Sequence, residues 1–188
     1  MAKKTISDFR SALKGGGARP NLFEVTLDFP TGAKLDTSDG DLDTFLVKSA
    51  ALPASNVTPI EVPFRGRILK IAGDRTFDTW TITIINDIKF AHRDAFERWM
   101  NKINKLSDAT GEVDPKEYQK EVYVKQLDRD GNSLREYKFY GVFPTNISQI
   151  DLSMETTDTI EEFTVELQVQ WWEAIKGKSG NAGGNNIS

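Results

Sequence analysis

The sequence contains no cysteine and only one histidine, His92, among its 188 residues. Thiol catalysis, disulfides and cysteine-based zinc sites are therefore excluded. A catalytic role for His92 would need an oriented nucleophile and a supporting carboxylate, and the sequence indicates neither. We interpret His92 as an ordinary surface or helix-start histidine. No cofactor, metal site or enzymatic activity is predicted.

Long apolar runs and an excess of positive charge are also missing. No stretch of about 18 apolar residues occurs, so no membrane-spanning helix is expected, and the N-terminus lacks the apolar segment of a signal peptide. The net charge is −4, whereas a general electrostatic binder of nucleic acid needs a basic surface. The composition is otherwise that of one soluble domain with a substantial core.

Three short patterns suggest a ligand only weakly. The triple glycine at 15–17 precedes no Lys-Ser/Thr pair and is interpreted as a linker. Residues 128–132 match part of a calcium-binding loop but lack its full ligand spacing. Asp130-Gly131 is instead a strong hairpin signal. The acidic cluster at 36–43 is typical of a solvated loop. The function is therefore expected to lie in surfaces.

Residues 71–106 hold the clearest structural signal. A loop at 73–75 is expected, followed by a strand over 77–85 in which Trp80, Ile82 and Ile84 share one face. A helix is expected over about 90–106. Its apolar stripe recurs at steps of three and four and comprises Phe96, Trp99, Met100, Ile103 and Leu106.

The other ordered segments have the patterns of strands. We expect strands at 21–29, 44–52, 64–72, 118–127, 134–143, 147–154 and 160–172, with a turn at 144–146. Residues 57–62, flanked and interrupted by prolines, are expected to form an edge strand or an extended arm. Residues 1–17 resemble a flexible arm with one helical turn over 6–13, and 176–188 a flexible Gly/Asn-rich tail. One domain, 18–175, thus contains about seven or eight strands and one helix, an α+β or mainly β chain.

Two surface features each allow a plain and a specific interpretation. The polar side of the last strand repeats acidic and amide residues, which fits either an ordinary solvent face or the wall of a channel. Residues 51–72 are apolar and rich in proline, which fits either an irregular edge or an arm that docks on a neighbouring subunit. Composition alone favours the plain interpretation of both.

Six motifs together resemble the tail tube proteins of contractile-tailed bacteriophages. They span most of the chain in the order found in that family. They are ARPNLFEV (18–25), ALPA (51–54), IAGDRTFDTW (71–80), IND (85–87), PTN (144–146) and WWE (171–173). The residues that mark the family within the third motif are Gly73, Asp74, Arg75, Phe77 and Trp80. The acidic loop at 30–43 and the C-terminal tail look longer than in that family.

The resemblance implies a fold of two packed antiparallel sheets, or a distorted β-barrel, with one flanking helix. It implies hexameric rings that stack into a hollow tube within a contractile sheath, in a virion assembled in the host cytoplasm. It also implies the sheath protein, baseplate, tape-measure protein and tail terminator as partners, with DNA passing through and no membrane contact. The inter-subunit arm would then include Val57, Ile60, Val62, Phe64, Arg65 and Arg67.

The same resemblance implies that an acidic surface lines the bore. Duplex DNA carries about one charge per 1.7 Å of its axis, so a basic wall would hold it, whereas an acidic wall repels it within roughly 8 Å at physiological salt. The candidate bore-facing residues are Asp151, Glu155, Glu162 and Glu166. Two alternatives stay open: a tailocin or secretion-type tube that carries no genome, and a monomeric β-sandwich binding module.

Overall fold

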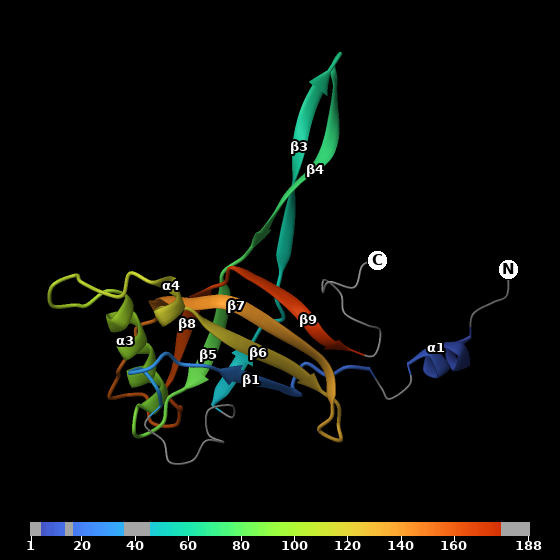
Figure 1. The fold of residues 1–188 in the computed structure, drawn as a ribbon. Helices are drawn as coiled ribbons and strands as arrows, with labels where there is room; N and C mark the ends of the chain where they lie inside the picture. The colour runs from blue at the N-terminus through green and yellow to red at the C-terminus, as the bar shows by residue number, and fades with distance from the viewer. Residues whose placement is uncertain (1–4, 14–16, 36–45, 178–188) are drawn as a thin grey trace.

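Nine strands and three helices make up the described part of the chain, which is residues 5–13, 17–35 and 46–177 of a computed structural model (Figure 1). Seven strands form one continuous antiparallel sheet, and the other two form a separate hairpin. The acidic cluster at 36–43 lies outside the described residues.

The seven-stranded sheet folds into two halves that share one long strand. Its order is β1 (Phe23–Leu27), β6 (Lys120–Leu127), β7 (Ser133–Ile147), β8 (Glu162–Gln168), β5 (Trp80–Ile85) and β2 (Val47–Ala50), with β9 (Trp171–Gly177) also paired to β7. The first part of β7 pairs with β6 and β9, and its last part pairs with β8. This arrangement confirms the prediction of a mainly β fold with two antiparallel sheets.

Gly141 lies where β7 passes from one half of the sheet to the other. Its φ of +62° belongs to the left-handed region, and a Cβ placed there would lie 2.5 Å from the side chain of Gln170. A larger residue would therefore meet both a backbone and a packing conflict. Glycine permits the strand to bend at the point where its partners change.

The core lies between the two halves of the sheet and beneath the main helix. Alternation buries Trp80, Ile82 and Ile84 on β5 and the three apolar residues of β8 (Phe163, Val165 and Leu167). The ring of Trp80 stacks on Phe139 of β7 with centroids 4.7 Å apart, so the two halves are in direct contact. The expected apolar face of β5 is thus confirmed.

Helix α3 (Ala91–Ile103) packs Phe96 and Trp99 into the core, where both are fully buried. The indole N–H of Trp99 donates to the Tyr118 carbonyl over 2.7 Å, which satisfies its one polar group. At the start of the helix, the Asp87 carboxylate accepts a hydrogen bond from the backbone N–H of Ala91 at 2.9 Å. This first turn contains His92, as the helix-start alternative predicted. The side chain is only 1% exposed, so the surface alternative is wrong.

The apolar stripe of α3 was predicted one turn too long. The helix ends at Ile103, and Leu106, beyond that end, is 97% exposed. A short helix, α4 (Pro115–Tyr118), follows and was not predicted; Asp114 caps it and Pro115 occupies its first position. Near the N-terminus, α1 (Ile6–Ala12) matches the predicted helical turn. It begins at a capping box formed by Thr5 and Asp8.

Several strand boundaries differ from the predictions. The predicted turn at 144–146 lies inside β7, as an irregularity in its pairing with β8. The predicted strand at 147–154 is wrong, because residues 148–161 contain no strand. The predicted strand at 160–172 divides into β8 and β9, because the Gln170 amide donates to the Tyr140 carbonyl and the chain turns back onto β7. Strand β9 also extends into the predicted tail, to Gly177.

Candidate assembly surfaces

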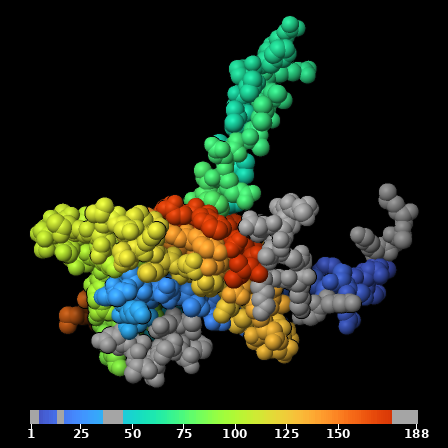
Figure 2. All heavy atoms as spheres, in the orientation of Figure 1, coloured from blue at the N-terminus to red at the C-terminus, as the bar shows by residue number. Residues whose placement is uncertain are grey.

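The hairpin of β3 (Ser55–Phe64) and β4 (Arg67–Phe77) projects from the body as a narrow arm (Figures 1 and 2). The ten residues of β3 span about 33 Å at the usual rise of a strand. Arg65 and Gly66 form the turn with φ values of 47° and 80°, the two positive angles of a type I′ hairpin turn. The segments expected at 57–62 and 64–72 therefore form one hairpin, and it is longer than predicted.

The loop predicted at 73–75 is instead part of β4. Gly73 and Asp74 together face Thr58, because the register shifts between Val57 and Pro59, which is the pattern of a β-bulge. A Cβ on residue 73 would lie 2.4 Å from the Thr58 carbonyl oxygen. Glycine is thus required by the close approach of the two strands, and the bulge accounts for the strong twist of the arm (Figure 1).

The two faces of the outer arm differ in chemistry. Directly paired residues share a face. One face carries the pairs Phe64–Arg67, Val62–Leu69 and Ile60–Ile71, whereas the other carries Pro63–Ile68, Glu61–Lys70 and Pro59–Ala72. The five apolar side chains of the first face are 40–65% exposed, and we call this surface the apolar arm face. The Glu61 carboxylate and the Lys70 ammonium lie 3.5 Å apart on the opposite face.

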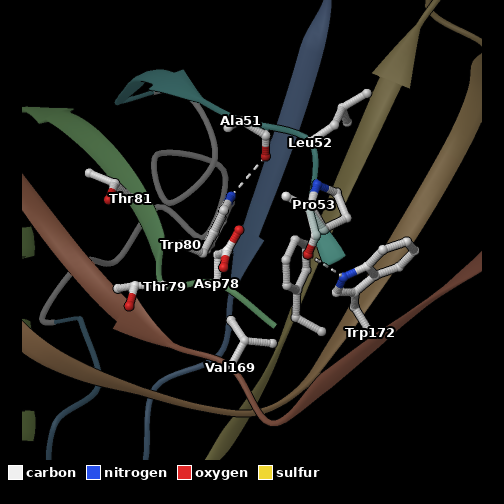
Figure 3. Close-up of a pocket in the computed structure, with 11 residues that line it drawn as sticks. Ala51, Leu52, Pro53, Asp78, Thr79, Trp80, Thr81, Val169 and Trp172 are labelled. Carbon is white, nitrogen blue, oxygen red and sulfur yellow. Dashed lines mark hydrogen bonds between the residues drawn. The ribbon is translucent and has the colours of Figure 1, made fainter. Parts of the chain in front are cut away.

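Two tryptophans hold the base of the arm (Figure 3). The Trp80 indole N–H donates to the Ala51 carbonyl at 2.8 Å, and the Trp172 indole N–H donates to the Ala54 carbonyl at 3.1 Å. The ring of Trp172 also meets Phe77, the last residue of β4, with centroids 6.3 Å apart. These contacts fix the segment that leads into β3 on both sides of Leu52 and Pro53.

Three of the sequence motifs meet at this base. They are the segments at 51–54, 71–80 and 171–173, and a small pocket of about 190 Å³ lies between them. Of the motif residues, Phe77 and Trp80 make the contacts described above and Gly73 forms the bulge. Asp74 and Arg75 are exposed on β4. These three motifs therefore form the attachment of the arm to the body.

A second surface is the outward face of β5 and β8. It is polar along both strands, where Thr81 pairs with Glu166, Thr83 with Thr164 and Ile85 with Glu162. Glu166 is exposed, while Glu162 forms an ion pair with Lys48 of β2, with 2.5 Å between the charged atoms. Sequence reasoning missed this lysine, because the pairing of β2 with β5 brings it beside β8 from 114 residues away.

The other two predicted acidic residues lie elsewhere on the chain. Asp151 and Glu155 are both exposed and belong to the strand-free segment between β7 and β8. Asp151 accepts a hydrogen bond from the Gln149 amide at 3.1 Å. The structure therefore places Glu162 and Glu166 on one face of one strand and the other two acidic residues on a connecting segment.

The outward face of the other half-sheet carries paired charges. The Lys138 ammonium lies 2.7 Å from the Glu121 carboxylate and 4.5 Å from the centroid of the Tyr140 ring. The hydrogen bond from Lys138 to Glu121 raises the pKa of that ammonium above its usual range. The pKa of Tyr140 is also raised, and the main cause is its hydrogen bond to Glu173. Sequence reasoning did not single out this network.

Neither a metal cluster nor a membrane-spanning helix is found within the described ranges. The surfaces above are instead built for contact: one long apolar arm that the body does not cover, and one polar sheet face. An exposed apolar surface of this kind is typical of a protein that binds other protein chains.

The comparisons with known proteins identify the family. The family model for phage tail tube proteins matches residues 18–174, and the chain therefore belongs to the phage tail tube protein family. The tail tube protein gp19 of Enterobacteria phage T4 is 35% identical over 171 residues, which cover 89% of this chain and 99% of gp19. Proteins of this family are structural components of the tails of contractile-tailed phages.

Solved structures share the fold at low sequence identity. A chain in the baseplate of the anti-feeding prophage aligns with a TM-score of 0.61 and 12% identity, covering 86% of this chain and 97% of that one. A chain in the sheath-tube complex of an extracellular contractile injection system aligns with a TM-score of 0.56 and 15% identity, covering 92% and 100%. These likenesses support the fold inferred from the sequence.

Proposed function

We propose that this chain forms hexameric rings that stack into the hollow inner tube of a contractile phage tail, the conduit for genome ejection. The observation that carries this proposal is the arm. Its five apolar side chains would be costly to leave in water, since each Å² of buried apolar surface stabilises an assembly by about 25 cal/mol. Family membership supplies the kind of assembly in which such a surface would be buried.

The proposed partners follow from the position of a tube in a tail. They are further copies of the chain, the sheath protein, the baseplate, the tape-measure protein and the tail terminator. The structures that share the fold come from sheath-tube, baseplate and terminator complexes of other systems. The tube would assemble in the host cytoplasm and act in the virion, and no catalytic step is needed.

In this proposal, the polar face of β5 and β8 lines the bore. Thr81, Thr83 and Thr164 offer neutral hydroxyl groups, and Glu166 adds exposed negative charge. DNA would be repelled from such a surface and would find no cluster of cations to hold it. The ion pair with Lys48 partly neutralises Glu162, so we assign the stronger repulsion to Glu166. Asp151 and Glu155 stay weaker candidates for the bore.

The sequence relatives favour a tube that carries a genome over a secretion-type tube. Gp19 of phage T4 is 35% identical to this chain, whereas the injection-system chains share only 12–15% identity. A monomeric binding module is disfavoured because it would leave the apolar arm face in water. Capsid and terminase genes next to the coding sequence would support the phage assignment.

Electron microscopy of the purified full-length chain, alone, concentrated and with added baseplates, tests the assembly. Hollow rods or six-fold rings are expected. A chain that stays monomeric in light scattering and does not extend baseplates would overturn the tube assignment.

The bore assignment has a separate test in phage particles. Glu166→Lys, alone and with Glu162→Lys, is expected to leave tubes intact and to slow genome ejection. The control is Glu117→Lys on α4, which makes the same charge change at another exposed carboxylate. Ejection that is unchanged, or slowed equally by the control, would remove these residues from the bore.

A further inference from the structure

A second apolar surface lies on the body, between α3 and the end of β7. This groove has a volume of about 410 Å³ and is lined by apolar side chains from both elements. They are Met100, Ile103, Leu106, Pro144 and Ile147, and the polar residues Glu97, Asn101, Asn104 and Thr145 complete the lining. Leu106, just beyond the end of α3, is almost fully exposed, so the groove is open to a partner rather than filled by the chain itself.

The groove matches the tip of the arm in size. An apolar cavity of about 150 Å³ accommodates a benzene-sized ring, so a groove of 410 Å³ has room for one aromatic ring and a neighbouring aliphatic side chain. Phe64 and Val62 supply this pair at the outer end of the apolar arm face, and Phe64 is 65% exposed. Both surfaces gain from leaving water.

The charges of the two surfaces are also complementary. Glu97 is the one charged residue among the described residues that line the groove. Its carboxylate accepts a hydrogen bond from Arg93 at 2.8 Å, and its side chain remains 55% exposed. The arm tip carries Arg67, paired with Phe64, and Arg65, whose guanidinium lies 5.3 Å from the Phe64 ring centroid. Insertion of Phe64 would therefore bring two cations toward a single carboxylate.

The arm cannot reach this groove within its own chain, because a twisted two-stranded ladder holds it away from the body (Figure 2). We propose that the tip of the arm, with Phe64 foremost, inserts into the groove between α3 and β7 of a second copy. The inference rests on the proposed function and deepens it, because it names the receptor surface. Glu97 of that copy would meet Arg65 and Arg67.

The absence of cysteine from the sequence allows a direct test. Arg67→Cys, beside Phe64 on the same face of the arm, and Asn104→Cys, in the lining of the groove, are introduced together into the full-length chain, which is assembled and then oxidised. Phe64 and the apolar lining stay in place. A disulfide needs Cα atoms within about 7 Å, so a ladder of linked chains on a non-reducing gel, with a peptide joining the two positions, is expected. The matched control pairs Asn104→Cys with Lys70→Cys, on the opposite face of the arm, and no ladder is expected from it.

A charge exchange gives a second readout that does not depend on new thiols. Glu97→Lys is expected to raise the protein concentration needed for assembly by about two- to fivefold, as loss of an exposed ion pair predicts. Adding Arg65→Glu and Arg67→Glu to that variant should restore assembly. In the wild-type background, the two arginine replacements alone should impair it.

Assembled chains that give no ladder from the first cysteine pair, or an equal ladder from the control pair, would overturn the groove as the receptor. The exposed apolar side chains of α1 (Ile6 and Phe9) would then be the next candidate for the groove, to be tested by the same cysteine pairing. The proposal that the arm mediates assembly would survive that result. If the wild-type chain forms no tubes even on baseplates, the proposed function itself fails.

Discussion

The arm and strand β5 use similar residues for opposite purposes. In β5, Ile82 and Ile84 have no exposed surface, whereas in the arm Ile60 and Ile71 are at least half exposed. Both pairs lie in regular antiparallel ladders. The difference is that β5 has a strand on each side and a core beneath it, while β3 and β4 have only each other. Strand sequence therefore specifies the ladder, and the neighbours decide whether its apolar face is buried.

Removing the arm should produce the largest effect. Asn56 and Thr76 face each other across the ladder, so residues 57–75 can be replaced by an Asn-Gly turn. We expect a folded monomer whose melting temperature changes by at most about 4 °C and that forms no tubes. Calorimetry and electron microscopy measure the two outcomes. Normal tubes from this variant would show that the arm is dispensable.

A matched pair of alanine replacements sharpens the comparison. Ile82→Ala should lower the free energy of unfolding by about 2–5 kcal/mol, because it leaves a cavity in the core. Ile60→Ala should change it by less than about 0.5 kcal/mol and should still weaken assembly. Urea denaturation of both monomers provides the test. Similar losses of stability would mean that the arm face is covered within the monomer.

Replacement of Gly73 tests the bulge. Gly73→Ala should distort the arm where the new Cβ meets the Thr58 carbonyl oxygen, leaving the core of the body unchanged. Hydrogen exchange is expected to rise in β3 and β4 and to stay constant in β5, and tubes should form poorly. Asp74→Ala is the control, since Asp74 is exposed beside the same bulge. Equal effects of the two variants would remove the steric explanation.

The smallest effect is expected at the base of the arm. Trp172→Phe keeps an aromatic ring beside Phe77 and removes the hydrogen bond to the Ala54 carbonyl. The cost should be about 1 kcal/mol, the net contribution of one such bond. Hydrogen exchange at residues 55–57 should then increase. Trp171→Phe, at an exposed ring that stacks on Tyr140, serves as the control.

The local pattern predicted the elements whose periodicity is strong. The helix at α3, the alternation in β5 and the Asp130-Gly131 hairpin could all be found in this way. The base of the arm could not, because the indole bonds of Trp80 and Trp172 join segments that are far apart in the chain. The contact of Lys48 with Glu162 was missed for the same reason.

The errors at 73–75 and 144–146 share a physical cause. Glycine and proline are typical of turns, and both segments contain one of them, yet both are irregularities within strands. A bulge and a turn need similar residues, and only the partner strand distinguishes them. The boundary between β8 and β9 was missed because Trp171 continues the apolar alternation after the chain has already left the ladder of β8.

Pro59 and Pro63, both on β3, affect the tendency of a free chain to aggregate through the open edge of the arm. An open strand edge is a template on which unrelated chains can add, and it invites aggregation. Proline has no amide hydrogen to donate, and the ladder with β4 continues past both prolines, so the donors they lack belong to the outer edge of β3. In the proposed assembly, free chains would thus be protected against strand-to-strand aggregation, and the side chains of the arm would select its partner.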